Sequence, residues 1–334
     1  MKSYIKAIGY YLPENVVTNE ELVAEFPEWT VEKIADKVGV KQRHVAGDGE
    51  TATDLAVKAA ENLFVENTDI DKESIDFVIF CTQSPDHLLP TSACIIQQRL
   101  GLRTNIGAFD FNLGCSGYVY GLSIAKGLIA GGIATNVLLL TGETYSKHLH
   151  PRDKGNRTIF GDAATATVVS TEGFAEIGGF ALGTDGRGAE NLIIKSGGAR
   201  CPEKVGDLSF DENGNPHSSD YLFMNGSEIF MFTQKNVPIV VKKTLAKNNL
   251  TLDDLGLVVF HQANSYMLNF LRKKIKIPKE KFFINMENIG NTVSNSIPIA
   301  LYDAKKQDLL HGPVLICGFG VGYSWGGCIL NAKS

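Results

Sequence analysis

Short, uninterrupted apolar runs alternate with helical patterns along the whole chain of 334 residues. Five runs read as strands buried on both faces, at 77–80, 137–140, 164–169, 257–260 and 314–317. Helical patterns lie between them, at 53–64, 92–100, 118–130 and 266–275. Alternation of this kind predicts a sheet covered by helices on both faces. We therefore expect an α/β protein.

The order of these runs repeats at long range. Three pairs of runs, separated by 174 to 180 residues, follow the same order: 77–80 with 257–260, 109–111 with 283–285, and 137–140 with 314–317. The period is far longer than that of a solenoid repeat, so it indicates a duplicated domain. We expect one half over residues 1–174 and the other over 175–334. Chance similarity between α/β segments is the alternative.

Composition narrows the classes of function. With 44% hydrophobic and 21% charged residues, the chain is globular rather than disordered. A net charge of −5 argues against a nucleic-acid partner, and no run reaches the roughly 20 apolar residues of a membrane span. The first residues lack a signal-peptide core, and none of the six cysteines forms a Cys-x-x-Cys pair. We expect a cytoplasmic protein with reduced thiols.

One cysteine, Cys115, has a setting that the other five lack. It lies in Asn112–Tyr118, after a strand-like run at 106–111 and before the helical run at 118–130. The thiol is thus expected in a tight turn at a helix N-terminus, where the helix dipole and free N–H groups favour the nucleophilic thiolate. We then expect faster alkylation of Cys115 than of the other cysteines near neutral pH. A buried structural cysteine is the alternative.

His261 and Asn291 are candidates for handling the proton and the charge that a cysteine nucleophile requires. His261 directly follows the apolar run at 257–260, and α/β folds place ligands at the ends of their strands. Asn291 follows another strand-like stretch. Each residue has a plainer alternative, because a lone histidine is more often structural and Asn-Gly segments usually form turns.

Glycine is abundant, with 34 residues in the chain, and several of them lie in Gly318–Gly327. This segment holds a Gly-x-Ser-x-Gly pattern around Ser324, but its strand-like flanks predict a hairpin rather than the strand–turn–helix elbow of a serine hydrolase. Its backbone N–H groups can instead stabilise an oxyanion. The basic run at 272–281 is either a solvated helix end or a landing site for an acidic partner.

Taken together, these motifs resemble the thiolase superfamily and, within it, the β-ketoacyl-acyl carrier protein synthase III family. The resemblance covers essentially the whole chain. It rests on Arg43-His44, the Pro-Asp-His-Leu-Leu-Pro-Thr-Ser-Ala-Cys stretch at 85–94, Gly-Cys-Ser-Gly at 114–117, Ile-Phe-Gly-Asp-Ala-Ala at 159–164, His-Gln-Ala-Asn at 261–264, Gly-Asn-Thr at 290–292 and the glycine loop that ends in Trp325-Gly326. It implies a duplicated, five-layered αβαβα fold and a homodimer.

The resemblance also implies a reaction. A catalytic Cys115, His261 and Asn291 would use an acyl-CoA and a malonyl-acyl carrier protein as substrates, with no cofactor and no metal. Cys115 would take the acyl group, and an oxyanion hole of backbone N–H groups at Cys115, Gly320 and Val321 would stabilise the developing charge. Decarboxylation of the malonyl group would then leave an enolate, to which His261 and Asn291 would donate hydrogen bonds.

Further roles carry over by position. Trp29 matches the tryptophan that stacks on the adenine of CoA, and Lys154 and Lys37 stand where arginines contact the nucleotide, although lysine stacks less well. Leu89 stands where a phenylalanine commonly closes the acyl pocket across the dimer. The remaining matches are Asn264 and Phe319 as substrate contacts, and Lys273 and Lys274 as carrier-protein docking residues.

Departures from the family pattern leave other functions open. Tyr266 replaces the arginine expected after His-Gln-Ala-Asn, and the loop after Asn291 is bulkier than usual. One alternative is a divergent acyltransferase of the same family that uses an oxygen or nitrogen nucleophile in a specialised pathway. A second is a thioester hydrolase that uses Ser324 or the Cys115–His261 pair. A third is a non-enzymatic carrier-binding subunit.

Overall fold

The computed structural model of the protein describes residues 1–333, and ten of its strands form one sheet. The strands of the first half are β1 (Tyr4–Tyr11), β4 (Phe77–Cys81), β5 (Gly107–Phe111), β6 (Asn136–Glu143) and β7 (Ala163–Ser170). Those of the second half are β8 (Ala175–Thr184), β13 (Leu257–Phe260), β14 (Phe282–Phe283), β15 (Gly312–Gly320) and β16 (Ser324–Ala332). All five predicted strands are present.

The strand order repeats from the two edges of the sheet inward. It reads β14-β13-β15-β16-β8 from one edge and β5-β4-β6-β7-β1 from the other. In each half the second strand is parallel to both neighbours, and the fourth is antiparallel to both. The predicted duplicated fold is therefore confirmed. The proposed boundary at 174/175 falls between β7 and β8, where the two halves also meet through β1 and β8.

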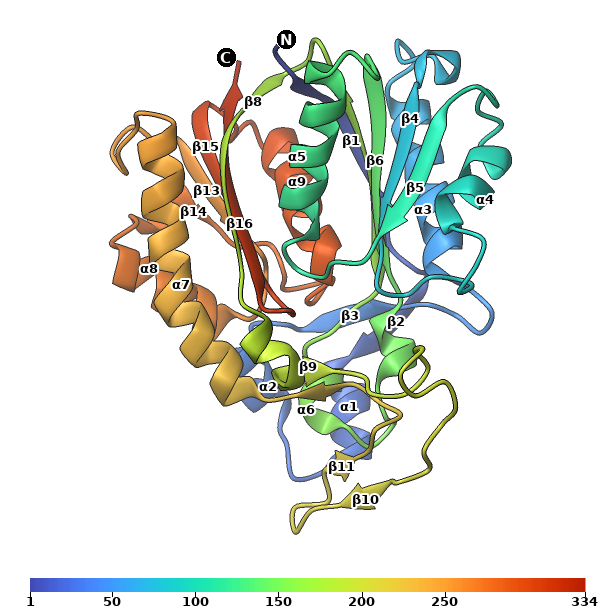
Figure 1. The fold of residues 1–334 in the computed structure, drawn as a ribbon. Coiled ribbons are helices and arrows are strands. Elements are labelled where there is room, and N and C mark those ends of the chain that lie inside the picture. The colour runs from blue at the N-terminus through green and yellow to red at the C-terminus, as the bar shows by residue number, and fades with distance from the viewer. Residues whose placement is uncertain (334) are drawn as a thin grey trace.

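Helices and the two halves of the sheet form five layers (Figure 1). On the two outer sides lie α3 (Ala52–Glu66) with α4 (Ser92–Arg99), and α7 (Gly226–Lys247) with α8 (Ser265–Ile275). Between the two halves lie α5 (Gly117–Ala130) and α9 (Ser296–Lys306), which contact strands of both halves. Because α5 is buried in this central layer, its sequence is apolar nearly all round.

Three apolar clusters fill the spaces between these layers. The central one joins α5 and α9 to the sheet, for example through Tyr118, Leu122 and Leu301. The second lies between the sheet and the α7–α8 layer, and the third lies under α3 and α4. The close approach of α5 to β6 requires a glycine, because a Cβ on Gly121 would lie 2.6 Å from a methyl carbon of Leu139.

Smaller elements gather at one end of the sheet (Figure 1). They are β2 (Asn15–Thr18), α1 (Asn19–Glu25), α2 (Val31–Val38), β3 (Gln42–Val45), α6 (Lys154–Arg157), β9 (Leu192–Ile193), β10 (Ser209–Phe210), β11 (Pro216–His217) and β12 (Phe223–Met224). Strands β2 and β3 pair as an antiparallel ribbon. Within residues 1–333, none of the helices has the length and apolar character needed to cross a membrane.

Candidate active site

Cys115 lies in the turn between β5 and α5, as the sequence predicts. The turn is closed by the N–H of Gly117, which donates to the carbonyl of Gly114 at 2.7 Å. Helix α5 begins at Gly117, so the thiol lies just ahead of its N-terminus. The side chain is only 7% exposed. The structure thus places Cys115 at the end of a strand and the start of the central helix.

The glycine-rich end of β15 packs directly against this turn. A Cβ on Gly320 would lie 3.0 Å from both Cβ and Sγ of Cys115, and one on Gly318 would lie 2.6 Å from the carbonyl oxygen of Cys115. Real Cβ atoms essentially never show the contact at Gly318, and the contacts at Gly320 are tighter than nine in ten real ones, so glycine fits best at both positions. In addition, the hydroxyls of Ser116 and Ser324 are hydrogen-bonded to each other. The backbone expected to surround a thioester therefore does lie beside Cys115.

His261 follows β13 and is held by its neighbours on β15 and α9. Its backbone N–H donates to the carbonyl of Cys317 at 2.8 Å, and its Nδ1 lies 2.8 Å from Oγ of Ser296. The ring of Phe319 stands edge-on to the imidazole, with 5.7 Å between centroids. Burial lowers the pKa of His261 to about 3, because the charged ring would lose its hydration. His261 is therefore neutral at physiological pH.

Asn291 is fixed at both its backbone and its side chain. Its N–H donates to the carbonyl of Ile159 at 2.8 Å, and its Oδ1 accepts from the N–H of Val293 at 2.9 Å. One hydrogen of Nδ2 is directed to the carbonyl of Ala263 at 3.4 Å. A primary amide has two such hydrogens, so the other is available to a substrate.

Val293 links the three candidate side chains. It belongs to the same apolar cluster as Cys115, and its N–H holds Asn291. Its backbone also hydrogen-bonds to His261. This bond raises the pKa of the imidazole and partly offsets the lowering caused by burial. Val293 has a φ of +57°, a strained conformation for a β-branched residue. Strain of this kind persists where the surrounding contacts demand it, and Val293 shares an apolar cluster with Cys115 while its backbone bonds to Asn291 and His261.

The state of the Cys115 thiol differs from the sequence-based expectation. Burial, followed by the nearby carboxyl of Glu143, raises the pKa of Cys115 to about 12. These effects outweigh the backbone hydrogen bond that lowers the pKa, because a buried thiolate loses its hydration. The expected thiolate is therefore corrected to a neutral thiol, which needs a base at the moment of attack.

Glu143 is a buried carboxyl that sequence reasoning missed. It is fully buried at the end of β6 and accepts hydrogen bonds from the N–H of Gln83 at 3.1 Å and from Oγ of Ser84 at 3.2 Å. Its pKa lies well above the usual range, because burial disfavours the charged form. The one signal in the sequence is a glutamate three residues after the apolar run at 137–140.

A cavity of about 730 Å³ shares part of its lining with the apolar cluster that contains Cys115, although Cys115 is not itself among the lining residues. Five of its lining residues also belong to or pack against this cluster, namely Tyr145, Leu192, Ile194, Leu222 and Val321. The phenol of Tyr145 donates to Oε1 of Gln83 at 2.5 Å, and both residues line the cavity. Leu88 lines this cavity, whereas the predicted Leu89 does not and is 82% exposed.

The predicted nucleotide contacts gather near α2 and α6. Nζ of Lys37 lies 5.7 Å from the centroid of the Trp29 ring, and Nζ of Lys33 lies 5.3 Å from it. Lys154 is paired with Glu28, with 2.5 Å between Nζ and Oε1. Because Glu28 precedes Trp29, this pair brings Lys154 to the same patch. Glu28 itself was not foreseen.

The other predicted residues lie farther from the thiol or have structural partners. Oδ1 of Asn264 accepts from the N–H of Met267 at 2.8 Å and caps α8. Phe319 is 2% exposed and packs on His261. Lys273 and Lys274 are exposed in the last turn of α8. Ser324 lies on β16 in a hairpin with β15, so the hydrolase elbow is absent around it.

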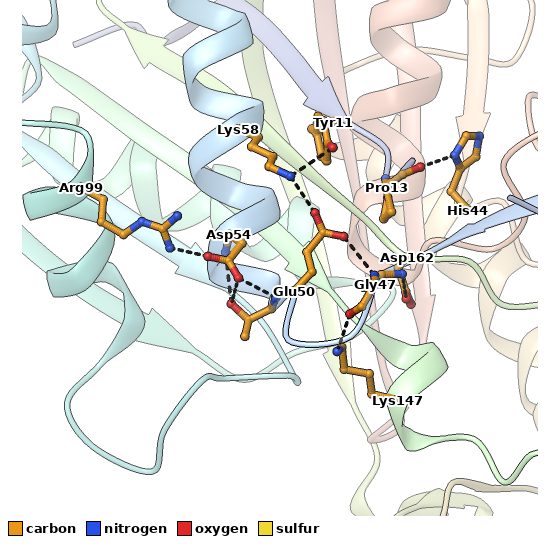
Figure 2. Close-up of polar contacts among 12 residues, drawn as sticks. Tyr11, Pro13, His44, Gly47, Glu50, Asp54, Lys58, Arg99, Lys147 and Asp162 are labelled. Atoms are coloured by element: carbon orange, nitrogen blue, oxygen red, sulfur yellow. Dashed lines mark hydrogen bonds and ion pairs between the residues drawn. The ribbon is translucent and has the colours of Figure 1, made fainter. Parts of the chain in front are cut away.

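A polar network fastens the loop after β3 to the segment that carries Tyr145 (Figure 2). Nζ of Lys147 donates to the carbonyl of Gly47 at 3.0 Å. The buried carboxyl of Asp162 accepts from the N–H of Ala46 at 2.8 Å and from the N–H of Ser146 at 2.9 Å. This network holds the wall of the cavity in place. Over residues 1–333, no group of three or more His, Cys, Asp or Glu side chains could hold a metal ion.

Comparison with known proteins now adds to this geometry. The family model described as 3-oxoacyl-[acyl-carrier-protein (ACP)] synthase III matches residues 109–186, and its C-terminal counterpart matches residues 245–332. A β-ketoacyl-[acyl-carrier-protein] synthase III of Clostridium perfringens is 37% identical over 326 residues, which is 97% of each chain.

Solved structures agree with these matches. A crystal structure of a 3-oxoacyl-(acyl-carrier-protein) synthase III superimposes with a TM-score of 0.96 at 48% identity, covering 99% of this chain and 100% of the other. The enzyme of Pseudomonas aeruginosa PAO1 gives a TM-score of 0.88 at 30% identity, covering 100% and 99%. The fold is thus that of a thiolase-like enzyme. Within that class, the chain belongs to the β-ketoacyl-[acyl-carrier-protein] synthase III family of acyltransferases.

Proposed function

We propose that the protein condenses an acyl-CoA primer with a malonyl-acyl carrier protein in a decarboxylative Claisen reaction, and so initiates the synthesis of a fatty acid or related chain. The observation that carries this proposal is the position of the Cys115 thiol, with Gly320 against its sulfur and His261 and Asn291 gathered around Val293. A nucleophile, a base and an amide donor are the groups that the two half-reactions require.

In the first half-reaction, the sulfur of Cys115 attacks the carbonyl carbon of the acyl-CoA thioester. The thiol proton passes to His261, the bond between the carbonyl carbon and the CoA sulfur breaks, and CoA leaves as a thiol once it has taken that proton. Backbone N–H groups of Cys115 and of the Gly320–Val321 segment stabilise the oxyanion. The product is an acyl-Cys115 thioester.

In the second half-reaction, the malonyl thioester loses CO₂, and the electron pair of the broken carbon–carbon bond forms an enolate. The available Nδ2 hydrogen of Asn291 donates to the enolate oxygen. The α-carbon then attacks the acyl carbon on Cys115, the carbon–sulfur bond breaks, and the thiolate takes up one proton. The product is a β-ketoacyl-carrier protein.

Binding roles follow from the surroundings of the thiol. The cavity of about 730 Å³, which shares lining residues with the apolar cluster of Cys115, supports an acyl site. The patch of Trp29, Lys37 and Lys154 supports a site for the CoA nucleotide. The exposed Lys273 and Lys274 support docking of an acidic carrier protein.

We propose a homodimer and a cytoplasmic location as well. The exposed leucines Leu88, which lines the cavity, and Leu89 support a partner surface, since adjacent large apolar side chains rarely stay uncovered. The six cysteines are free thiols in this structure, which fits a reducing compartment.

Release of labelled CO₂ tests the proposal against its rivals. Malonyl-carrier protein labelled at the free carboxyl is incubated with an acyl-CoA and the wild-type enzyme, with Cys115→Ala and Ser324→Ala as variants. We expect acyl-dependent CO₂ release that is lost in Cys115→Ala and kept in Ser324→Ala. Acyl transfer without CO₂ would instead support the divergent acyltransferase, and loss only in Ser324→Ala would support a hydrolase.

A further inference from the structure

Ser296, at the first position of α9, joins the histidine to the backbone of the strained loop. Its Oγ lies 2.8 Å from Nδ1 of His261 and 3.0 Å from the carbonyl oxygen of Val293. The N–H of Gln262 also approaches it at 3.3 Å. Ser296 is 3% exposed and His261 is 2% exposed, so water does not replace these contacts.

The hydroxyl of Ser296 has one hydrogen to give and two neighbours that could take it. The carbonyl of Val293 can only accept, whereas Nδ1 of a neutral imidazole either donates or accepts. The 3.0 Å contact with Val293 is therefore a donation from the hydroxyl, which uses its one hydrogen. Oγ then offers its lone pairs to the N–H of Gln262 and to Nδ1, and this arrangement requires the proton of His261 to sit on Nδ1.

We propose that Ser296 is a positioning residue that holds His261 in its Nδ1–H tautomer and thereby leaves Nε2 free to take the Cys115 proton during acylation. The inference rests on the function proposed above and sharpens it. In the balanced step, the thiol proton moves to Nε2 as sulfur attacks the thioester, and it then moves to the departing CoA sulfur. The imidazole ends the half-reaction neutral, as it began.

This assignment divides the work between two side chains. A neutral imidazole without a hydrogen on Nε2 cannot donate from that atom to an enolate oxygen, so that donation falls to Nδ2 of Asn291. This division of roles differs from the expectation that His261 and Asn291 both donate hydrogen bonds to the enolate. It also agrees with the raised pKa of Cys115 and the lowered pKa of His261, which keep both side chains neutral in the resting enzyme.

The tautomer can be measured in the resting enzyme without any substrate. Long-range nitrogen–proton spectra of the wild-type protein with ¹⁵N-labelled histidine separate the protonated from the unprotonated ring nitrogen, and His261→Gln assigns the signals. We expect the hydrogen on Nδ1. A hydrogen on Nε2 would overturn the inference and would leave the proposed condensation untouched.

Kinetics of the separate half-reactions provide the second test. Acylation is followed by intact mass after mixing with acyl-CoA, and condensation is followed from pre-acylated enzyme mixed with malonyl-carrier protein. Loss of one neutral hydrogen bond corresponds to about tenfold, so we expect Ser296→Ala to slow acylation about tenfold and condensation about twofold or less. Ser296→Thr keeps the hydroxyl and is expected to restore acylation.

Ser294→Ala is the matched control, because Ser294 is buried in the same loop but contacts Glu143 rather than His261. We expect this control to leave the ratio of the two half-reactions unchanged. Equal slowing of both half-reactions in Ser296→Ala, or the same selective loss in Ser294→Ala, would contradict a role through His261. The spectra of the wild-type protein decide the question even if Ser296→Ala does not fold.

Discussion

The Cα atom of Gly320 faces the thiol of Cys115 so closely that a methyl group on it would lie 3.0 Å from both Cβ and Sγ. These residues are 205 positions apart in the chain. Their contact joins the turn before α5 in the first half to the end of β15 in the second. The proposed oxyanion hole therefore depends on how the two halves pack.

Replacement of Gly320 by alanine tests this contact. The added methyl group displaces either the thiol or the β15 backbone by a few tenths of an ångström, whereas a misplacement of about 1 Å at a reacting group costs about 100-fold in rate. We expect Gly320→Ala to form acyl-Cys115 about tenfold more slowly while it stays folded in circular dichroism. Gly127→Ala is the control, because a Cβ there meets nothing within 4 Å and alanine stabilises a helix interior by about 0.5–1 kcal/mol. Normal acylation by Gly320→Ala would refute the tight contact.

The thiol of Cys115 is predicted to be slow towards alkylating reagents in the free enzyme. Its pKa is raised to about 12, so the reactive thiolate is rare near neutrality and increases with pH. We expect iodoacetamide at pH 7.5 to modify the exposed Cys94 at least tenfold faster than Cys115, as measured by peptide mapping. The rate at Cys115 should still rise above pH 9. The opposite result would be that Cys115 reacts fastest of the six cysteines, at a rate that does not change with pH below 8. That result would support the thiolate that the sequence predicts at the helix N-terminus.

His261 makes the folded state sensitive to acid. Its pKa is about 3 in the folded protein against 6.5 for an ordinary histidine, so between these values the unfolded chain binds a proton that the folded chain does not. Stability that is present above pH 6.5 is therefore lost as the pH falls towards 3, by up to about 1.4 kcal/mol per pH unit.

Comparison with His261→Gln isolates this effect, because the buried Glu143 and Asp162 remain in both proteins. Thermal unfolding is measured for each between pH 7 and pH 4. We expect the melting temperature of the wild type to fall more steeply on acidification than that of the variant. Parallel curves would mean that His261 takes up its proton in the folded state.

Glu28 is predicted to compete with the nucleotide for Lys154. The two side chains are 2.5 Å apart at their charged atoms, so a phosphate must share or displace this carboxylate. We expect Glu28→Gln to lower the KM for acyl-CoA about two- to fivefold and Lys154→Met to raise it, with kcat little changed in either variant. Glu287→Gln is the control, because it removes an exposed ion pair with Lys41 in the same way. An unchanged KM in both Glu28→Gln and Lys154→Met would remove Lys154 from the nucleotide site.

Local patterns were sufficient to predict most of the architecture. Strand and helix signals come from neighbouring residues. Cys115 could be identified because a strand-like run directly precedes its turn and a helical run directly follows it. The equal spacing of the strands likewise predicted the duplication, because it compares one segment with another. His261 was marked by its place at the end of β13.

Long-range packing decided what sequence reasoning missed. Ser296 and Glu143 matter through contacts with segments far away in the chain, and neither carries a local motif. The charge state of Cys115 was predicted wrongly for the same reason, since its burial comes from β15 and from the cavity wall around Tyr145. The Glu28–Lys154 pair spans 126 residues and leaves no pattern in either segment.

A single turnover from isolated acyl-enzyme tests the central claim most directly. The enzyme is acylated with an acyl-CoA, freed of CoA by gel filtration, and mixed with malonyl-carrier protein labelled at the free carboxyl. We predict that each acyl group lost from Cys115 releases one labelled CO₂ and appears in one β-ketoacyl-carrier protein. Loss of the acyl group to water, or its transfer with no CO₂ released, would contradict the account.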